Sequence, residues 1–242
     1  MKKTVFLLGM VFALFSCNSG KKESSEANSE SNSDVKSEKV SSKSSGKTYD
    51  CLKKFEENYD LLLTKEEMTS VYPFNTDAAK VELRSGSYGQ HIFQWPSDRP
   101  TFTMEVSGMK MNLPDQNTMG IKNLSFYDDV SDLKSNIEIF DMGYKQLSDK
   151  ELAQIDKNLD KAEDEVKKTG KDLMEVRAKS AWQAVDGLGS SSWYKWNNQW
   201  GGELVVLAGI AKFTILTKIS SDPEENREIA KKLAEKVLAK CK

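Results

Sequence analysis

The amino-acid composition of the chain changes abruptly after Thr48, and this change limits where a folded core can form. The 31 residues from Asn18 to Thr48 include eleven serines but only three apolar side chains. Such a segment buries too little apolar surface to offset the entropy lost on ordering. The sequence therefore predicts a disordered Ser/Lys/Glu-rich linker over 17–48. It also predicts one globular domain over 49–242, whose 194 residues are enough for a single core.

The first sixteen residues are organised like a bacterial signal peptide. Lys2 and Lys3 precede an apolar run from Val5 to Phe15, which is too short to cross a bilayer as a helix. The Leu-Phe-Ser triplet before Cys17 resembles the relaxed lipobox of Bacteroidetes lipoproteins. The resemblance implies a type II signal peptide over 1–16, lipidation of Cys17, and anchoring in the outer membrane or the periplasm-facing cell envelope. An ordinary secretory peptide or a short uncleaved anchor is the alternative.

The charge balance argues against several classes of partner. The chain has 35 Lys and Arg against 37 Asp and Glu, and the domain alone has 27 against 32, a net charge of −5. A nucleic-acid-binding protein needs a cationic surface, so we expect no nucleic-acid partner and no adhesion of the domain to anionic lipid. The single histidine, His91, excludes any site with several histidine ligands, and we expect neither a metal nor a cofactor.

The cysteine count suggests one disulfide. If Cys17 carries lipid, Cys51 and Cys241 remain as a pair at the two ends of the domain, and an exported protein meets an oxidising compartment. The sequence therefore predicts a Cys51–Cys241 disulfide, which would close a very long loop and contribute about 5 kcal/mol by chain entropy. Two unpaired thiols are the alternative.

Capping sequences predict three main helices. The helices begin after Thr64, Ser148 and Asp222, each of which precedes a glutamate by three residues. The middle helix carries one narrow apolar stripe, which we interpret as a long helix lying on a sheet. Its stripe consists of Leu152, Ile155, Leu159, Ala162 and Val166.

Between these helices the apolar period is close to two, which is typical of strands. Strands are predicted over 80–85, 90–95 and 101–109, and a hairpin over 203–208 and 211–217 turns at Gly209-Ile210. Helices and strands thus alternate in blocks. This order favours an α+β fold, with antiparallel strands packed against the three main helices in a single domain.

The C-terminal quarter resembles PsbP-like secreted lipoproteins. The residues that carry the likeness are Val185 to Gly189, Trp193-Tyr194, Gly201 to Leu207, Phe213 to Leu216, and Lys231 to Ala234. Ser190 and Ser191 stand where an acidic and a small residue are usual. The resemblance implies a binding or scaffolding role without shared catalytic residues.

The sequence lacks the common catalytic motifs. The sequence has no phosphate-binding or dinucleotide-binding glycine loop, no H-E-x-x-H and no C-x-x-C. The serines at 190–192 lack the nucleophile-elbow pattern, and His91 is interpreted as a polar or half-buried strand residue. The aspartates 128, 129 and 132 lack the glycine and distal glutamate of a calcium loop, which favours a solvated turn.

A cluster of aromatic residues is the one pattern in the sequence that points to a possible binding surface. Four of the five tryptophans, at 182, 193, 196 and 200, lie within nineteen residues. Trp182 is predicted on the last turn of a helix, and Trp193 and Trp196 on opposite faces of a strand. Core packing explains most of such a cluster, but Tyr194, Trp196 and especially Trp200 are candidates for contact with a ligand.

Two functional classes follow. The first is a lipid-anchored, non-catalytic binding or assembly module of the envelope, held to the membrane by its N-terminal lipid and facing a protein or glycan partner. The second is an envelope glycan-acting enzyme that uses a carboxylate pair such as Glu105 and Glu203. We assign no catalytic residue.

Overall fold

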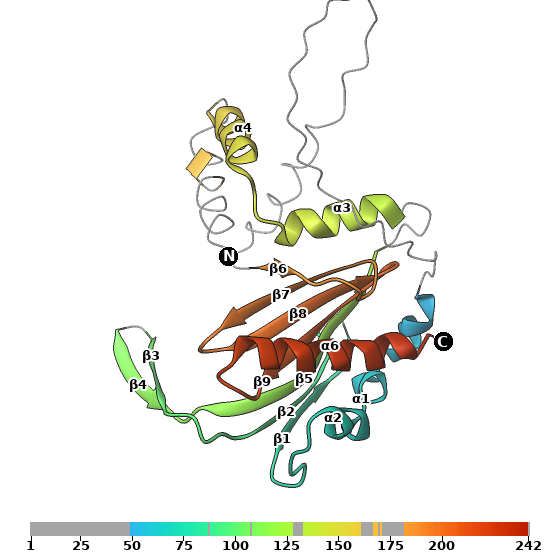
Figure 1. Ribbon diagram of the computed structural model, residues 1–242, viewed down its shortest axis with the longest axis vertical. Helices are drawn as coiled ribbons and strands as arrows, with labels where there is room; N and C mark the ends of the chain where they lie inside the picture. Colours follow the sequence, from blue (N-terminus) through green and yellow to red (C-terminus); the bar gives the residue numbers. More distant parts are fainter. Residues whose placement is uncertain are drawn as a thin grey trace, which may run out of the picture. The chain divides into compact units, whose positions relative to one another are not determined.

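A computed structural model describes residues 49–86, 88–106, 108–127, 133–160, 167–168, 170 and 182–241 (Figure 1). The predicted signal peptide, Cys17 and the linker lie outside this part of the chain. Within it, a seven-stranded antiparallel sheet packs against helices, which confirms the predicted α+β fold. Among the same residues, no helix is both long enough and apolar enough to cross a bilayer.

The strands of the large sheet follow the order β1-β2-β5-β9-β8-β7-β6, and β3 and β4 form a separate hairpin. The strands are β1 (Lys80–Arg84), β2 (Gln90–Pro96), β3 (Phe102–Val106), β4 (Met109–Leu113), β5 (Gln116–Phe126), β6 (Gln183–Ala184), β7 (Ser191–Asn197), β8 (Gly201–Ala208) and β9 (Ala211–Lys218). The helices are η2 (Asp50–Phe55), α1 (Tyr59–Leu62), α2 (Lys65–Val71), α3 (Leu133–Tyr144), α4 (Asp149–Leu159) and α6 (Pro223–Ala239).

The three predicted helix starts are confirmed. Thr64 and Ser148 each form a capping box with the glutamate three residues later, at the starts of α2 and α4. Asp222 caps α6 by accepting a hydrogen bond from the Glu224 amide at 2.9 Å, and Pro223 occupies the first helical position. These caps fix where the helices begin.

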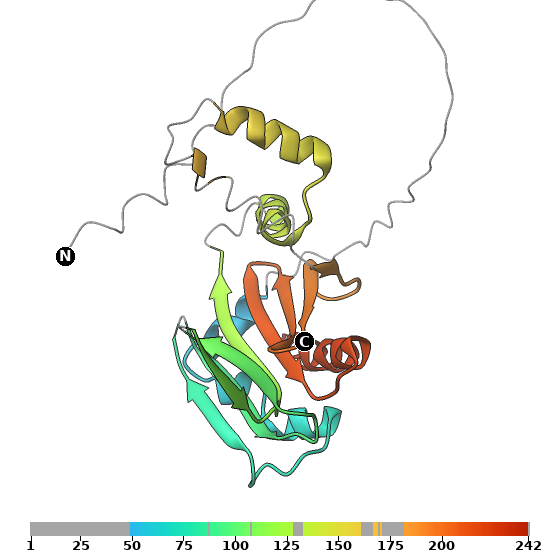
Figure 2. The same cartoon turned by 90° about the vertical axis from the view of Figure 1, so that its left-hand side faces the viewer.

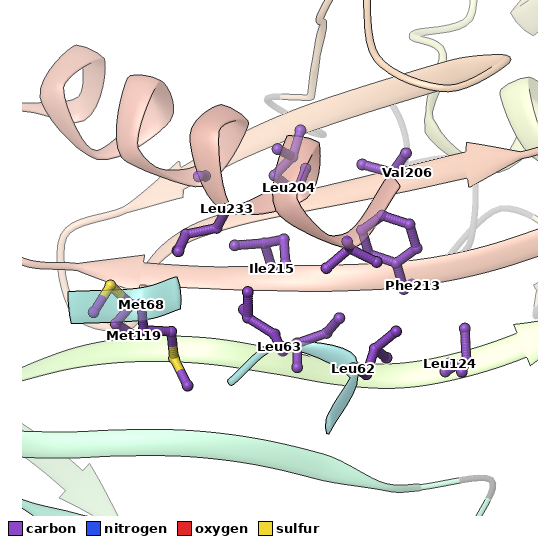
Figure 3. Close-up of a cluster of buried hydrophobic side chains, with 14 of the residues drawn as sticks. Leu62, Leu63, Met68, Met119, Leu124, Leu204, Val206, Phe213, Ile215 and Leu233 are labelled. Carbon is purple, nitrogen blue, oxygen red and sulfur yellow. The ribbon is translucent and has the colours of Figure 1, made fainter. Parts of the chain in front are cut away.

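One face of the sheet, here called the helix face, carries the main core. Successive strand residues point to opposite faces, and Leu204 and Val206 of β8 pack with Phe213 and Ile215 of β9 beneath α6 (Figure 3). Leu233 of α6 packs into the same cluster. The helices η2, α1 and α2 add their buried side chains to it, namely Leu52, Phe55, Tyr59, Leu62 and Met68.

A buried asparagine fixes the approach of α6 to the sheet. The side-chain oxygen of Asn226 accepts a hydrogen bond from the Ile219 amide at 2.7 Å, and its amide nitrogen donates to the Asp222 carbonyl at 2.7 Å. Thr217 of β9 donates to the Asn226 carbonyl at 3.1 Å. Because these buried polar groups are mutually satisfied, the end of β9 and the first turn of α6 are held together.

The opposite face of the sheet is covered differently from the prediction. None of the residues of α4 is buried, so the expectation that this helix lies on the sheet is wrong for 149–159. The last two residues of the predicted stripe, Ala162 and Val166, lie outside the described residues. Instead α3, which the sequence analysis did not predict, places Phe140 against Val205 and Leu207 of β8. A capped amphipathic helix therefore does not identify which helix packs on a sheet.

The region between β2 and β5 also differs from the prediction. The strand expected over 101–109 ends at Val106, and β4 returns beside it as a hairpin arm (Figure 2). Gly108 has a φ of +80°, which glycine adopts without strain and which permits the reversal. Strand β5, in the interior of the sheet, was not predicted. Its register shifts between Lys122 and Ser125, next to Asn123 with a φ of 56°.

The structure joins Cys51 and Cys241 by a disulfide, as the cysteine count predicts. Their Cα atoms are 5.6 Å apart, which is typical of a disulfide, and 190 residues separate them in sequence. Cys51 belongs to η2 and Cys241 follows α6, and both pack against the core of the helix face. The bond therefore ties the two ends of the domain together within one layer.

Candidate functional site: the charged face of the sheet

The strand register places every charged residue of the seven described strands on the face opposite α6. Residues paired directly across neighbouring antiparallel strands point to the same face. One such row runs Glu82, Ile92, Gly120, Leu216, Glu203, Lys195 across six strands. The face defined in this way, here called the charged face, carries Lys80, Glu82, Arg84, Lys122, Lys195, Glu203, Lys212 and Lys218.

The charge of this face is opposite in sign to that of the domain. Its six cations and two carboxylates give a net charge of +4. Residues 49–242 together have a net charge of −5, so the rest of the domain carries −9. A local excess of one sign on a protein of the other sign attracts an oppositely charged partner. The geometry therefore favours an anionic group at the charged face.

Glu203 lies between two lysines in the middle of the face. Its carboxylate accepts from the Lys122 ammonium at 2.8 Å and contacts the Lys195 ammonium at 3.1 Å. Burial by itself raises the pKa of Glu203, but the hydrogen bonds and charges of the two lysines outweigh burial and leave that pKa below its usual value. Glu203 is therefore a carboxylate at neutral pH and reduces the positive charge of its two neighbours.

Aromatic side chains adjoin the Lys195 end of this cluster. The Lys195 ammonium lies 4.7 Å from the ring centroid of Trp182, a favourable cation–π distance. Trp182 also meets Tyr144 of α3 edge to face, with ring centroids 4.8 Å apart. Trp182 immediately precedes β6 and is not helical, so its predicted place on a helical turn is wrong.

Asp141 connects α3 to the charged face. Its carboxylate accepts from the Ser191 hydroxyl at 2.5 Å and from the Trp193 indole N–H at 2.9 Å. Both donors belong to β7, the strand that carries Lys195. A charged acceptor strengthens such hydrogen bonds, so this contact fixes α3 along the edge of the face.

A second charged cluster closes the other end of the face. Asp115 accepts from the Lys218 ammonium at 2.5 Å and from Arg99 Nε at 2.7 Å. Burial raises the pKa of Asp115, but the hydrogen bonds of Arg99 and Lys218 outweigh it and lower that pKa overall. Lys218 also donates to the Gln199 carbonyl at 2.7 Å and lies over the Phe102 ring. This cluster therefore joins the root of the β3–β4 hairpin to the turn between β7 and β8.

Between these clusters, the apolar side chains of the charged face are buried or half-buried. Ile92 is 6% exposed and Leu216 is half-buried, and Gly120 lies between them. A Cβ atom at Gly120 would lie 2.2 Å from the His91 carbonyl oxygen, so the close approach of β2 requires glycine there. The exposed groups of this region are thus the ends of polar and cationic side chains.

The three aromatic candidates for ligand contact fall into different environments. Tyr194 is only 3% exposed and its hydroxyl donates to the Pro223 carbonyl at 3.1 Å, so its assignment to a ligand surface is wrong. It lies on the helix face, where burial raises its pKa. Trp196 is half-buried against the same core. Trp200 is 65% exposed and remains a candidate.

The turn that carries Trp200 is held by side-chain hydrogen bonds. The Asn197 side-chain oxygen accepts from the amides of Gln199 and Trp200, at 2.8 and 3.0 Å, as in a local turn motif. Gly201, with a φ of +85°, then returns the chain into β8 beside Lys218. The exposed indole therefore stands on an ordered turn next to the charged face.

The other chemical candidates are not brought together. Glu105 is exposed in the β3–β4 hairpin and Glu203 is held by its lysines in the large sheet, so the two do not belong to one strand layer. His91 lies in β2 as predicted, but it is buried on the helix face, with Nδ1 2.9 Å from the Leu63 carbonyl oxygen. The aspartates at 128, 129 and 132 lie outside the described residues.

The charged face itself was missed by the sequence analysis. Its signal is present in β1, where Lys80, Glu82 and Arg84 alternate with Val81 and Leu83. Lys122 and Lys195 stand singly in β5 and β7, and Lys212 and Lys218 lie near the two ends of β9. Only the pairing of the strands from β5 to β7 brings these cations together.

Within the described part of the chain, no group of three or more His, Cys, Asp or Glu side chains could hold a metal ion. Comparisons of the chain with protein-family models, with curated proteins and with solved structures give no match.

Proposed function

We propose that this protein is a lipid-anchored lipoprotein of the bacterial cell envelope whose domain binds a partner and catalyses no reaction. The single observation that carries the binding role is the segregation of strand charges onto one face, with a net charge of +4. The anchoring role is supported by the sequence at Cys17, which resembles a lipobox.

The chemistry of the charged face supports binding in preference to catalysis. A general acid needs a pKa raised toward neutrality, whereas the pKa values of Glu203 and Asp115 are lowered by their lysine and arginine neighbours. A general base needs access to the proton it removes, whereas His91 is 5% exposed and bonded to a backbone carbonyl. The carboxylates of Glu203 and Asp115 instead hold the lysine and arginine side chains of neighbouring segments in place.

Anchoring is tested by metabolic labelling with a fatty acid. We expect the wild-type protein to be labelled and to remain with the membrane fraction, and Cys17→Ala to remove the label and to release the protein or block its processing. Cys51→Ala serves as the control, because loss of a disulfide cysteine leaves the lipidation site intact. An unlabelled, soluble wild-type protein contradicts the lipoprotein proposal.

Binding is tested by capture from an envelope extract at low and high salt. The proposed electrostatic contact predicts that the captured partner is released as the ionic strength rises, because salt screens exposed charges beyond about 10 Å at 0.1 M. A partner that stays bound at 1 M salt would instead point to an apolar contact.

A further inference from the structure

We infer that the charged face binds an acidic polysaccharide, a polymer of sugars that carry carboxylate groups. This inference rests on the proposed binding role and names the class of its partner. The observations that carry it are the arrangement of the lysines, the low position of the apolar residues and the charge of the surrounding domain.

The cations lie at more than one place on the sheet. The ammonium groups of Lys122 and Lys195 converge on the Glu203 carboxylate in the middle of the face. Strand β1, which carries further cations, is separated from β5 by β2, which corresponds to about 10 Å at the usual spacing of neighbouring strands. Lys80 and Arg84 extend the row of cations to the β1 edge, where both are exposed. A surface with cations at such intervals matches a polymer with regularly spaced anions better than a single compact anion.

The face differs from a typical protein-binding surface. Protein interfaces are depleted in lysine and centre on exposed aromatic or aliphatic side chains. Here Ile92, Val205 and Leu207 are buried, and the exposed ends belong to lysines and to polar side chains such as Gln90, Gln94 and Thr118. Amide and hydroxyl groups beside cations suit a ligand that carries both hydroxyls and carboxylates.

The face also differs from a membrane-binding surface. Adsorption to a bilayer combines cations with apolar side chains that enter the headgroup boundary. The apolar residues of this face do not project, since Ile92 is 6% and Val205 5% exposed. The rest of the domain has a net charge of −9 and would be repelled by an anionic lipid surface. A flexible polymer can lie along the charged face without approaching the acidic remainder.

The test uses the full chain in a non-ionic detergent and polygalacturonate as the acidic polysaccharide. Binding is measured by titration calorimetry at low salt, with neutral dextran as the uncharged probe. We expect polygalacturonate to bind and dextran not to bind. Lys122→Gln and Lys195→Gln should each weaken binding by up to about fivefold, as for one exposed ion pair. Lys122→Arg should restore it.

Glu203→Gln is the most discriminating variant, because its expected effect on affinity is opposite in sign to that of the lysine variants. Removal of this carboxylate frees two lysines, so affinity should rise by up to about fivefold. Lys232→Gln, on the exposed surface of α6, is the matched control and should leave affinity unchanged. Circular dichroism of each variant verifies that the fold is retained.

Three results would overturn the inference. The first is that polygalacturonate does not bind to the folded protein, and the second is that its affinity is the same for the lysine variants and for wild type. The third is that poly-glutamate or phosphatidylglycerol vesicles bind with the lysine dependence described above while polygalacturonate does not, which assigns the face to another class of partner. In each case fatty-acid labelling and envelope capture still report separately on the proposed lipoprotein.

Discussion

The two faces of the seven-stranded sheet are made by alternate residues of the same strands, yet they differ in almost every physical respect. The helix face carries no Lys, Arg, Asp or Glu in any of these described strands, and η2, α1, α2 and α6 cover it. The charged face carries all eight such residues, and α3 covers only its β7–β8 side.

The difference separates stability from recognition. On the helix face, burial of apolar area supplies free energy of folding, so each buried side chain there is constrained by its neighbours. On the charged face, most ion pairs are partly exposed, and such pairs contribute little to stability. The exposed polar and cationic side chains of the charged face can therefore vary for a partner without loss of the fold.

The largest expected effect comes from the helix face. Phe213 is fully buried beneath α6, and Phe213→Ala should lower the free energy of unfolding by about 3 to 5 kcal/mol through lost burial and a cavity. Leu216 lies on the charged face of the same strand and is half-buried. Leu216→Ala should therefore lower the free energy of unfolding by only about 1 to 2 kcal/mol. Urea denaturation measures both. Equal losses would contradict the assignment of stability to one face.

The disulfide tests the same comparison at the ends of the helix layer. The double variant Cys51→Ser, Cys241→Ser should lose about 2 to 4 kcal/mol, because the unfolded chain regains the freedom of a very long loop. Its affinity for polygalacturonate should be unchanged, since both cysteines lie on the helix face. Reduction of the wild type should also shift its electrophoretic mobility. Two free thiols in protein trapped directly from the envelope would refute the bond.

The smallest effect is expected at the exposed indole. Trp200→Ala should change stability by less than about 0.5 kcal/mol, because 65% of the residue is in solvent. Trp182→Ala, which loses packing against Tyr144 and Lys195, should cost about 2 kcal/mol and serves as the comparison. We also expect Trp200→Ala to reduce partner capture. Equal destabilisation by the two variants, or unchanged capture, would remove Trp200 from the binding surface.

The elements that the sequence predicts correctly are those whose signals are local. Thr64, Ser148 and Asp222 mark helix starts because the capping group lies within three residues of the amide that it satisfies. Gly209-Ile210 marks a hairpin because the turn and its two strands are contiguous.

Strand β5 shows why the remainder could not be predicted. Met119 and Ile121 have the period of a strand, but the bulge at Asn123 moves the next core residue to Leu124, so the alternation is lost. Helix α3 did offer a signal, because Ile137, Phe140 and Tyr144 recur at helical spacing.

The candidate site depended on long-range order. The sequence correctly placed Trp193 and Trp196 on opposite faces of β7, because that inference needs only one strand. The contact of Lys122 with Glu203 joins residues 81 positions apart and needs the register of β5, β9 and β8. Local patterns cannot supply that register.

The Cys51–Cys241 bond has a mechanical consequence under the proposed lipid anchoring. Tension along the proposed anchor would enter the folded domain just before Cys51, and the covalent link would pass it directly to the end of α6. Helix η2 therefore cannot be peeled away from α6 on its own, and force is shared with the helix layer as a whole. A ligand pulling on the opposite face would then load the sheet across its thickness, where many contacts must break at once, instead of unzipping it strand by strand.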